Sequence, residues 1–211
     1  MGTNDLTYGP LHRGWHIQTQ YAPFFTSILD RLLERFEYMV NRHGRVLFIR
    51  FDMRYPKDIA YPPDNLALQE FVNNLTQQLR RLKIDSQYVW VREKKEAARG
   101  SEEPRNHHYH FVLLLDGHDI KNTYYHIEYV TKLWAGVLGV TDRRGLIHDC
   151  RGSDGEFVVS NGAMICRNSP DFEATFGHCY YWASYLAKQE TKDHTPYHVR
   201  RVGCSELRDN V

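Results

Sequence analysis

HHYHFVLLLD, residues 107–116, is the stretch around which the rest of the chain can be arranged. The apolar run that follows the histidines is typical of a buried strand. Side chains alternate between the two faces of a strand, so His108 and His110 lie side by side while Tyr109 and Phe111 face the other way. Two imidazoles placed in this way suit a divalent metal ion, although an H-x-H triplet alone is also typical of ordinary polar residues at a strand entrance.

The bulk composition sets wide limits. The chain has 211 residues, and we expect an N-terminal arm over residues 1–22, loosely held as far as about residue 20, followed by one domain over residues 23–211. Its net charge of +1 neither requires nor excludes a nucleic-acid partner, so any phosphate-binding surface must be a local patch. No G-x-x-x-x-G-K-[ST] stretch is present, which excludes an obvious nucleotide-driven motor.

The cysteines and the hydropathy favour a reduced, non-membrane environment. No C-x-x-C pair and no secretory signal are present, so we expect reduced thiols in a cytoplasmic protein, and the spacing indicates no structural zinc site. No apolar run approaches about 18 residues, so neither a transmembrane helix nor a membrane partner is expected. The four cysteines are Cys150, Cys166, Cys179 and Cys204.

Hydrophobic periodicity predicts an α+β fold, a central antiparallel β-sheet flanked by helices. Residues 45–53 and 87–93 are predicted strands, and residues 140–169 are expected to form short strands and turns. Helices are predicted over about residues 23–44, 64–83, 119–138 and 171–190. Their expected core positions are Phe25, Leu29, Leu32, Phe36 and Met39; Leu68, Phe71, Leu75, Leu79 and Leu82; Ile127, Val130, Trp134 and Val137; and Phe172, Phe176, Cys179, Ala183 and Leu186.

A hairpin brings a carboxylate to the histidines. Residues 94–106 have loop composition and connect strand 87–93 to strand 107–116. Folding this hairpin places Glu93, at the end of the first strand, beside His108 or His110. Two neutral imidazoles and one carboxylate leave open positions for water and a phosphate oxygen, as an Mg²⁺ or Mn²⁺ site requires. Taken alone, Glu93 is equally well explained as a surface charge.

Three further polar residues have open assignments. Arg50 and Asp52 share one face of strand 45–53, where they either form an ion pair or solvated edge or border the histidines. His148 lies in the short strands and turns and is expected to be structural.

The last predicted helix carries two tyrosines and a lysine away from its core face. Tyr181, Tyr185 and Lys188 lie at i, i+4 and i+7. Packing is the usual explanation for such an aromatic pair, but the core positions are already supplied by other residues. A tyrosine has a pKa near 10 and needs help to act as a nucleophile, and a nearby ammonium can favour the phenolate or hold the phosphate that it attacks. Tyr185 and Lys188, one turn apart, meet this requirement.

These features together resemble the HUH endonucleases, the rolling-circle replication initiators and relaxases. The resemblance rests on Glu93, on the triplet HYH at residues 108–110 and on YWASYLAK at residues 181–188, which follow in the order of that family. More narrowly, residues 46–52 and 184–188 and the chain length resemble the YagK/YfjJ type, related to the inovirus second-gene product, over roughly residues 25–207.

The resemblance implies an HUH/RRM-like palm fold and a nuclease mechanism. His108, His110 and Glu93 would hold Mg²⁺ or Mn²⁺, and a tyrosine would attack single-stranded DNA, leaving a 5′-phosphotyrosyl adduct and a free 3′-hydroxyl. Tyr181 and Tyr185 have the spacing of the two-tyrosine branch of the family. Ser184 stands where phage initiators carry a second lysine, so Tyr185 is the favoured nucleophile and the role of Tyr181 is open.

The leading prediction is an endonuclease and strand transferase that initiates phage or prophage replication. Its partners would be origin DNA, which can form a hairpin, and a host helicase with other replication proteins. Arg50, Lys94 and Lys95 are expected to contact DNA, and His107 to be structural or to face DNA. Two alternatives remain, a non-catalytic DNA-binding regulator that holds phosphates with Lys and Arg clusters, and a metal-dependent phosphodiesterase that uses an activated water.

Overall fold

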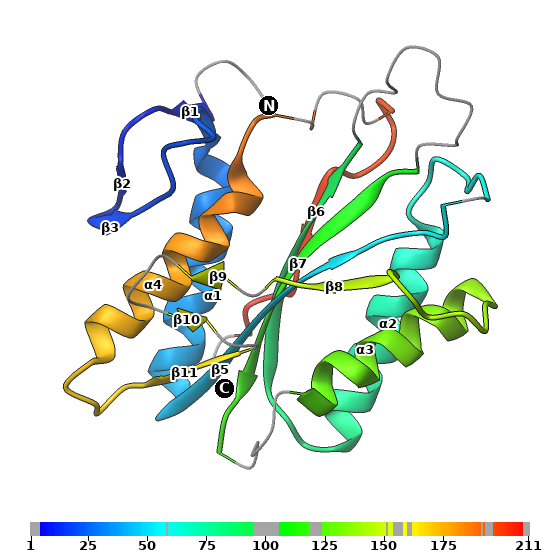
Figure 1. The fold of residues 1–211 in the computed structure, drawn as a ribbon. Helices are drawn as coiled ribbons and strands as arrows, with labels where there is room; N and C mark the ends of the chain where they lie inside the picture. Colours follow the sequence, from blue (N-terminus) through cyan, green and yellow to red (C-terminus); the bar gives the residue numbers. More distant parts are fainter. Residues whose placement is uncertain are drawn as a thin grey trace.

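The centre of the fold is a six-stranded antiparallel sheet with helices on both faces (Figure 1). The computed structural model describes residues 5–57, 59–94, 106–118, 124–150, 152–153, 158–159, 162–190, 192 and 196–208. The strand order is β11-β5-β7-β6-β12, and β8 pairs with the end of β5 that β11 leaves open. The strands are β5 (Arg45–Met53), β6 (Ser86–Glu93), β7 (His108–Asp116), β8 (Ile147–Asp149), β11 (Ala163–Cys166) and β12 (Val202–Cys204).

The helices cover the two faces of the sheet in pairs. They are α1 (Thr26–Arg42) and α4 (Phe172–Ser184) on one face, and α2 (Leu66–Arg81) and α3 (Tyr124–Leu138) on the other. The predicted α+β class is therefore confirmed, while the closer likeness to an HUH/RRM-like palm stays a prediction.

The predicted hairpin is also confirmed. Strands β6 and β7 pair along its whole length, with Glu93 directly opposite His108.

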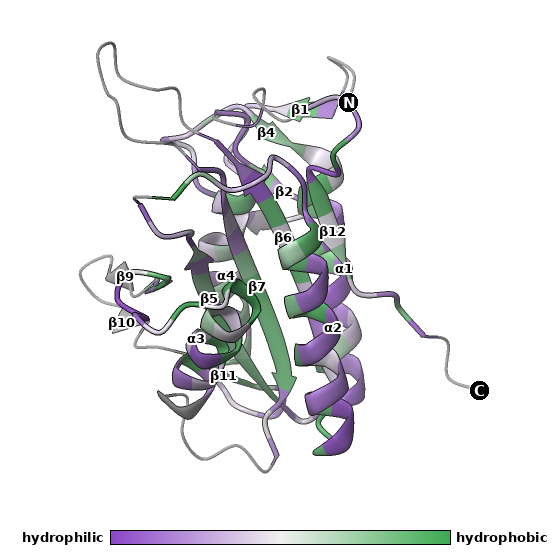
Figure 2. Ribbon diagram, turned by 90° about the vertical axis from the view of Figure 1, so that its right-hand side faces the viewer, coloured by the Kyte–Doolittle hydropathy of each residue, from purple (hydrophilic) through white to green (hydrophobic). Residues whose placement is uncertain are grey.

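Strand alternation divides the hydrophobic core into two layers, with apolar strands between helices whose outer faces are hydrophilic (Figure 2). On β5, Val46 and Phe48 pack against α1 and α4, whereas Leu47 and Ile49 pack against α2 and α3. Burying one such side chain stabilises the fold by roughly 1.5–3 kcal/mol. A shift of the strand register by one residue would turn the side chains on each face of β5 towards the wrong layer of the core. The two layers therefore fix which residues at the end of the strand face α4.

The predicted helical core positions are buried or partly buried with one exception. Leu82 is 57% exposed, because α2 ends at Arg81 and Lys83 turns the chain with a positive φ of 57°. The helix predicted from residue 119 is described only from Tyr124, since residues 119–123 lie outside the described residues. Within the described part of the chain, none of the helices is both long and apolar enough to span a membrane.

Three residues of the N-terminal arm, His12, Ile17 and Gln18, are buried, which differs from the loosely held arm expected there. Ile17 is buried, and the His12 ring shares a 2.7 Å hydrogen bond with the Tyr180 hydroxyl. No period is visible in this part of the sequence because each strand has only two residues. The short strands pair as β1 (Leu6–Thr7) with β4 (Phe24–Phe25), β2 (Leu11–His12) with β3 (Trp15–His16), and β9 (Gly152–Ser153) with β10 (Val158–Val159).

The last helix is shorter than the sequence predicts. α4 ends at Ser184, a single 3-10 turn covers Tyr185–Ala187, and Lys188 has an extended backbone with ψ 139°. The Gln189 N–H donates to the Pro23 carbonyl at 2.8 Å, so the chain leaves the helix to run beside the segment that precedes α1. Tyr185 and Lys188 therefore lie at the end of the helix rather than on a regular helical face.

Candidate active site

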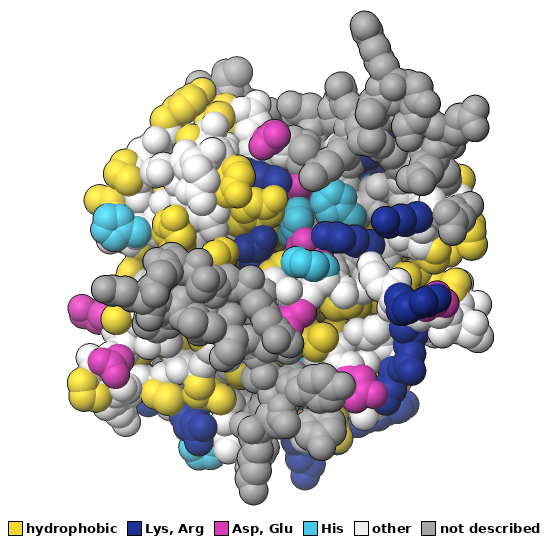
Figure 3. Space-filling view, in the orientation of Figure 1, with side chains coloured by type: hydrophobic (Ala, Val, Ile, Leu, Met, Phe, Trp, Pro, Cys, Tyr) yellow, Lys and Arg dark blue, Asp and Glu magenta, His cyan; other side chains and the backbone are white. Residues whose placement is uncertain are grey.

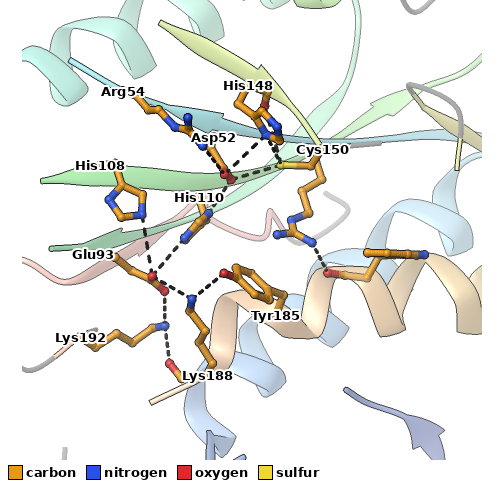
Figure 4. Close-up of polar contacts among 12 residues, drawn as sticks. Asp52, Arg54, Glu93, His108, His110, His148, Cys150, Tyr185, Lys188 and Lys192 are labelled. Carbon is orange, nitrogen blue, oxygen red and sulfur yellow. Dashed lines mark hydrogen bonds and ion pairs between the residues drawn. The ribbon is translucent and has the colours of Figure 1, made fainter. Parts of the chain in front are cut away.

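The candidate site continues the inner row of side chains on the sheet face that α1 and α4 cover. Apolar residues of this row give way to polar ones near the end where β6 stops and β7 begins, and these converge on the end of α4 (Figure 4). The register places Asp52 of β5 directly opposite His110 of β7, and Glu93 of β6 opposite His108. The hairpin thus brings together the three residues predicted as metal ligands, and β5 adds a second carboxylate.

Glu93, His108 and His110 form a group that could hold a metal ion, with one ligand atom from each lying within 4.8 Å of the others. His110 Nε2 lies 3.1 Å and His108 Nε2 lies 3.9 Å from Glu93 Oε2. Neighbouring ligands of an octahedral Mg²⁺ lie about 3 Å apart. One edge of the group already has this length, and a small rotation of His108 would close the other.

His110 gives the clearest evidence that the group fits a cation. Its Nδ1 lies 2.5 Å from Asp52 Oδ1, and because an ionised carboxylate only accepts hydrogen bonds, Nδ1 is the donor. Its buried Nε2 has no hydrogen-bond partner although it faces the Glu93 carboxylate. Both ring nitrogens therefore face carboxylates; a metal ion would take the position between Nε2 and Glu93, and an Asp on the far ring nitrogen is the usual support of a metal-binding His.

The electrostatic environment keeps His108 and Glu93 in the forms that bind metals. Burial and the neighbouring His110 lower the pKa of His108 to about 4, so its ring is neutral at pH 7. Burial alone would raise the pKa of Glu93, but contacts with His110, Lys192 and Lys188 outweigh it and hold that pKa below its usual value. A neutral His108 beside an ionised Glu93 is the protonation state that a divalent metal requires of these two ligands.

Two buried lysines support Glu93 from the side opposite the histidines. Lys192 Nζ donates to Glu93 Oε1 at 2.8 Å and also to the Lys188 carbonyl, and both Lys192 and Glu93 are fully buried. Lys188 Nζ lies 3.3 Å from Glu93 Oε2. The two ammoniums fix the carboxylate and make it a shared centre between the histidines and the end of α4.

Tyr185 lies beside this centre. Lys188 Nζ donates to the Tyr185 hydroxyl oxygen at 2.6 Å, and the Tyr185 ring lies 5.2 Å from the His110 ring in an edge-to-face contact. The Arg50 guanidinium stacks 4.4 Å over the same ring, and Tyr21 packs edge-on against it at 5.1 Å. The structure therefore joins Tyr185, Lys188 and the candidate metal group into one continuous set of contacts.

Tyr181 is not part of that set. Its ring neighbours are His178 and Trp182, and it lines a cavity of about 410 Å³ with residues of β3 and α4, including Trp15 and Gly177. Among the described residues, the Tyr181 ring contacts neither the His108 ring nor the His110 ring. Ser184, which precedes Tyr185, is buried, and its hydroxyl donates to the Tyr181 carbonyl at 2.7 Å.

The residues predicted to contact DNA have different surroundings. Arg50 is half-buried and donates to the Trp182 carbonyl at 3.1 Å, so it braces α4 as well as the Tyr185 ring. Lys94 is half-buried at the end of β6, and Lys95 lies outside the described residues. Basic, acidic and histidine side chains gather at the centre of the face shown in Figure 3.

Sequence analysis did not identify Lys192, and it assigned a structural role to His148. Lys192 carries no periodic or motif signal, because it follows the helix and is placed only by the turn after Lys188. His148 lies directly opposite Asp52 on β8 with a side chain 55% exposed, so it borders the site rather than the core. His107 is buried, and its Nε2 lies 2.9 Å from the Tyr109 hydroxyl, which makes it structural.

Comparison with known proteins agrees with the narrower of the two resemblances. Residues 12–205 match the sequence profile of a family described as the YagK/YfjJ C-terminal domain. The chain is 27% identical over 196 residues to "Uncharacterized protein YagK" of Escherichia coli strain K12, an alignment that covers 81% of this chain and 88% of that protein. Neither comparison bears on the wider HUH superfamily, which stays a prediction.

Proposed function

The chain belongs to the YagK/YfjJ C-terminal domain family, and we propose that it is a metal-dependent single-stranded DNA endonuclease and strand transferase with Tyr185 as its nucleophile. The observation that carries the proposal is the series of contacts from His110 to Glu93, from Glu93 to Lys188, and from Lys188 to the Tyr185 hydroxyl. These contacts support the proposal because they connect Tyr185, just after α4, to a candidate metal group on the sheet.

The chemistry follows from these contacts. Lys188 donates to the Tyr185 oxygen and so favours the phenolate, whose proton leaves to solvent. The phenolate attacks the scissile phosphorus, an O–P bond forms, and the bond from phosphorus to the 3′-oxygen breaks; that oxygen takes a proton and becomes a 3′-hydroxyl. A divalent ion held by Glu93, His108 and His110 would polarise the phosphate and offset its charge. The reverse transfer rejoins a strand.

The charge of the site fits a phosphodiester substrate. Two carboxylates, Glu93 and Asp52, lie among the cationic side chains of Lys188, Lys192 and Arg50. A bound Mg²⁺ or Mn²⁺ would make the region strongly positive, and a buried positive site stabilises the charge that develops on a transferring phosphoryl group. A neutral substrate would leave this charge uncompensated.

The free 3′-hydroxyl gives the proposed reaction its role. Such an end can prime DNA synthesis, so the protein would open a replication origin of a phage or prophage. Host helicase and replication proteins would then act on the nicked strand, and the protein would work in the cytoplasm. Arg50 and Lys94 would guide the strand towards Tyr185.

Adduct formation tests the proposal directly. The wild-type protein, incubated with labelled single-stranded DNA from prophage origins and Mn²⁺, should form a protein–DNA adduct that survives denaturing gels, and EDTA should prevent it. Tyr185→Phe should form none, and the matched control Tyr181→Phe should retain it. Three results would each refute the proposal. They are an adduct in Tyr185→Phe, no adduct in the wild type, and a product with a free 5′-phosphate.

A further inference from the structure

We propose that Asp52, His148 and Cys150 form a second metal site, and that this site takes Zn²⁺ rather than Mg²⁺ or Mn²⁺. One ligand atom from each of the three side chains lies within 4.8 Å of the others. They come from β5, from β8 and from the residue that follows β8 (Figure 4). The inference does not depend on the nuclease proposal, because it concerns a different donor set.

Backbone pairing holds the three residues in place. Asp52 lies directly opposite His148 in the β5–β8 ladder. Cys150 is two residues further along, so its side chain lies on the same face as His148, and its N–H donates to the Arg50 carbonyl at 3.3 Å. His148 and Cys150 are two residues apart, but Asp52 is distant in the sequence, so spacing alone could not have indicated the whole group.

The distances within the group match a tetrahedral ion. Cys150 Sγ lies 3.7 Å from His148 Nδ1, and His148 Nδ1 lies 3.8 Å from Asp52 Oδ2. The distance from Cys150 Sγ to Asp52 Oδ1 is 3.3 Å. Ordinary zinc–ligand bonds at tetrahedral angles separate neighbouring ligands by about 3.4–3.6 Å. The two Asp52 distances are to different carboxylate oxygens, so an ion would enter after the Asp52 carboxylate turns one oxygen towards both His148 Nδ1 and Cys150 Sγ.

The donor set decides which metal would bind. Glu93, His108 and His110 offer only oxygen and nitrogen, which Mg²⁺ and Mn²⁺ accept. The second group adds a sulfur atom, and soft thiolate ligands select Zn²⁺ over these ions. On binding, the Cys150 thiol gives up its proton to solvent and its hydrogen bond to Asp52 is replaced by a metal–sulfur bond.

Access and charge are also suitable. The His148 side chain is 55% exposed, which provides an entry path and leaves a position for a water ligand. Arg54 Nη2 lies 3.8 Å from Asp52 Oδ2, but the Arg54 side chain is itself 50% exposed and can move into solvent. Since Asp52 also accepts a hydrogen bond from His110, an ion here would share a carboxylate with the support of the first site.

Cobalt spectroscopy distinguishes this site from the first one. Co²⁺ bound to a thiolate gives a sulfur-to-metal charge-transfer band in the near ultraviolet, whereas Co²⁺ on nitrogen and oxygen ligands does not. When metal-free wild-type protein is titrated with Co²⁺, the intensity of this band should correspond to one thiolate-bound ion per protein. Adding Zn²⁺ should abolish the band, because Zn²⁺ displaces Co²⁺. Cys150→Ser should lack the band, and Cys166→Ser, the matched control at another half-buried cysteine, should keep it.

Two further variants keep the test decisive. His148→Ala changes an exposed side chain, so it should fold normally and still lose the band. His108→Ala removes the first site only and should keep it, so failure of the nuclease proposal would leave this result unchanged. The absence of a band in the wild type, or a band of wild-type intensity in Cys150→Ser or His148→Ala, would overturn the proposal.

Discussion

Lys192 should contribute strongly to the stability of the folded protein, although it lies outside every motif of the sequence. Its ammonium is 2.8 Å from Glu93 Oε1 and both side chains are fully buried. Lys192→Met keeps the length of the side chain and removes only its charge and its donors. The variant therefore separates the ion pair, together with the hydrogen bond to the Lys188 carbonyl, from the packing around them.

The expected cost follows from the surroundings of Glu93. Removing one partner of a buried ion pair costs about 3–5 kcal/mol, because the other charge stays buried without compensation. Lys188 Nζ remains 3.3 Å from the other carboxylate oxygen and still neutralises part of the charge. We therefore expect a loss near the lower limit, about 3 kcal/mol, which corresponds to a fall in Tm of roughly 6–12 °C for a domain of this size.

Urea and thermal unfolding at pH 7 in EDTA, followed by circular dichroism, would measure this loss. Lys132→Met is a suitable control, because Lys132 forms a surface ion pair with Glu128 at 2.6 Å and its side chain is 56% exposed; it should leave the Tm unchanged. Adding Glu93→Gln to Lys192→Met removes the uncompensated charge and should restore part of the stability. A Lys192→Met protein as stable as the wild type would show that the buried pair is not formed.

Two further outcomes are expected. Because the pKa of His108 falls from 6.5 to about 4 on folding, the unfolded chain binds more protons between these pH values, so the stability of the metal-free protein falls as pH drops through this window. Urea unfolding at pH 4 and pH 7 measures this difference in the free energy of unfolding, and His108→Gln should reduce it by up to about 3 kcal/mol. An unchanged difference in the variant would contradict the lowered pKa of His108. Asp52→Asn, which loses the charged acceptor of His110 Nδ1, should weaken Mn²⁺ binding about 10–100-fold by calorimetry, and unaltered affinity would exclude this support.

The parts of the site that sequence analysis could predict are those fixed by period and pairing. Alternation in strand 107–116 placed His108 and His110 on one face, and the hairpin brought Glu93 opposite His108. Both depend on rules that act between neighbours in the chain or across one turn. The apolar rows of β5 and β7 enforce the register, which explains why these assignments could be made from the sequence.

The residues that sequence analysis missed are those placed by long-range packing. His148 and Cys150 reach Asp52 only because β8 adds to the edge of β5 that β11 leaves open, and short strands of this kind have no detectable period. The helix was predicted to continue past Tyr185, but pairing of the chain with the segment before α1 ends it. Tertiary contacts determine both the position of β8 and the end of α4, and local sequence propensity does not predict such contacts.

Glu93 connects three parts of the site, and this limits how single substitutions can be interpreted. The same carboxylate faces His110, contacts Lys188 and pairs with Lys192. Glu93→Gln would weaken a metal group, free the ammonium that bonds to Tyr185 and remove the partner of a buried lysine at once. Residues that share a partner have non-additive effects, with coupling energies of about 0.5–3 kcal/mol. A loss of activity in Glu93→Gln would therefore not show that Glu93 binds a metal. Two double-mutant cycles would separate its roles: one with Lys192→Met, measuring stability, and one with His108→Gln, measuring Mn²⁺ affinity.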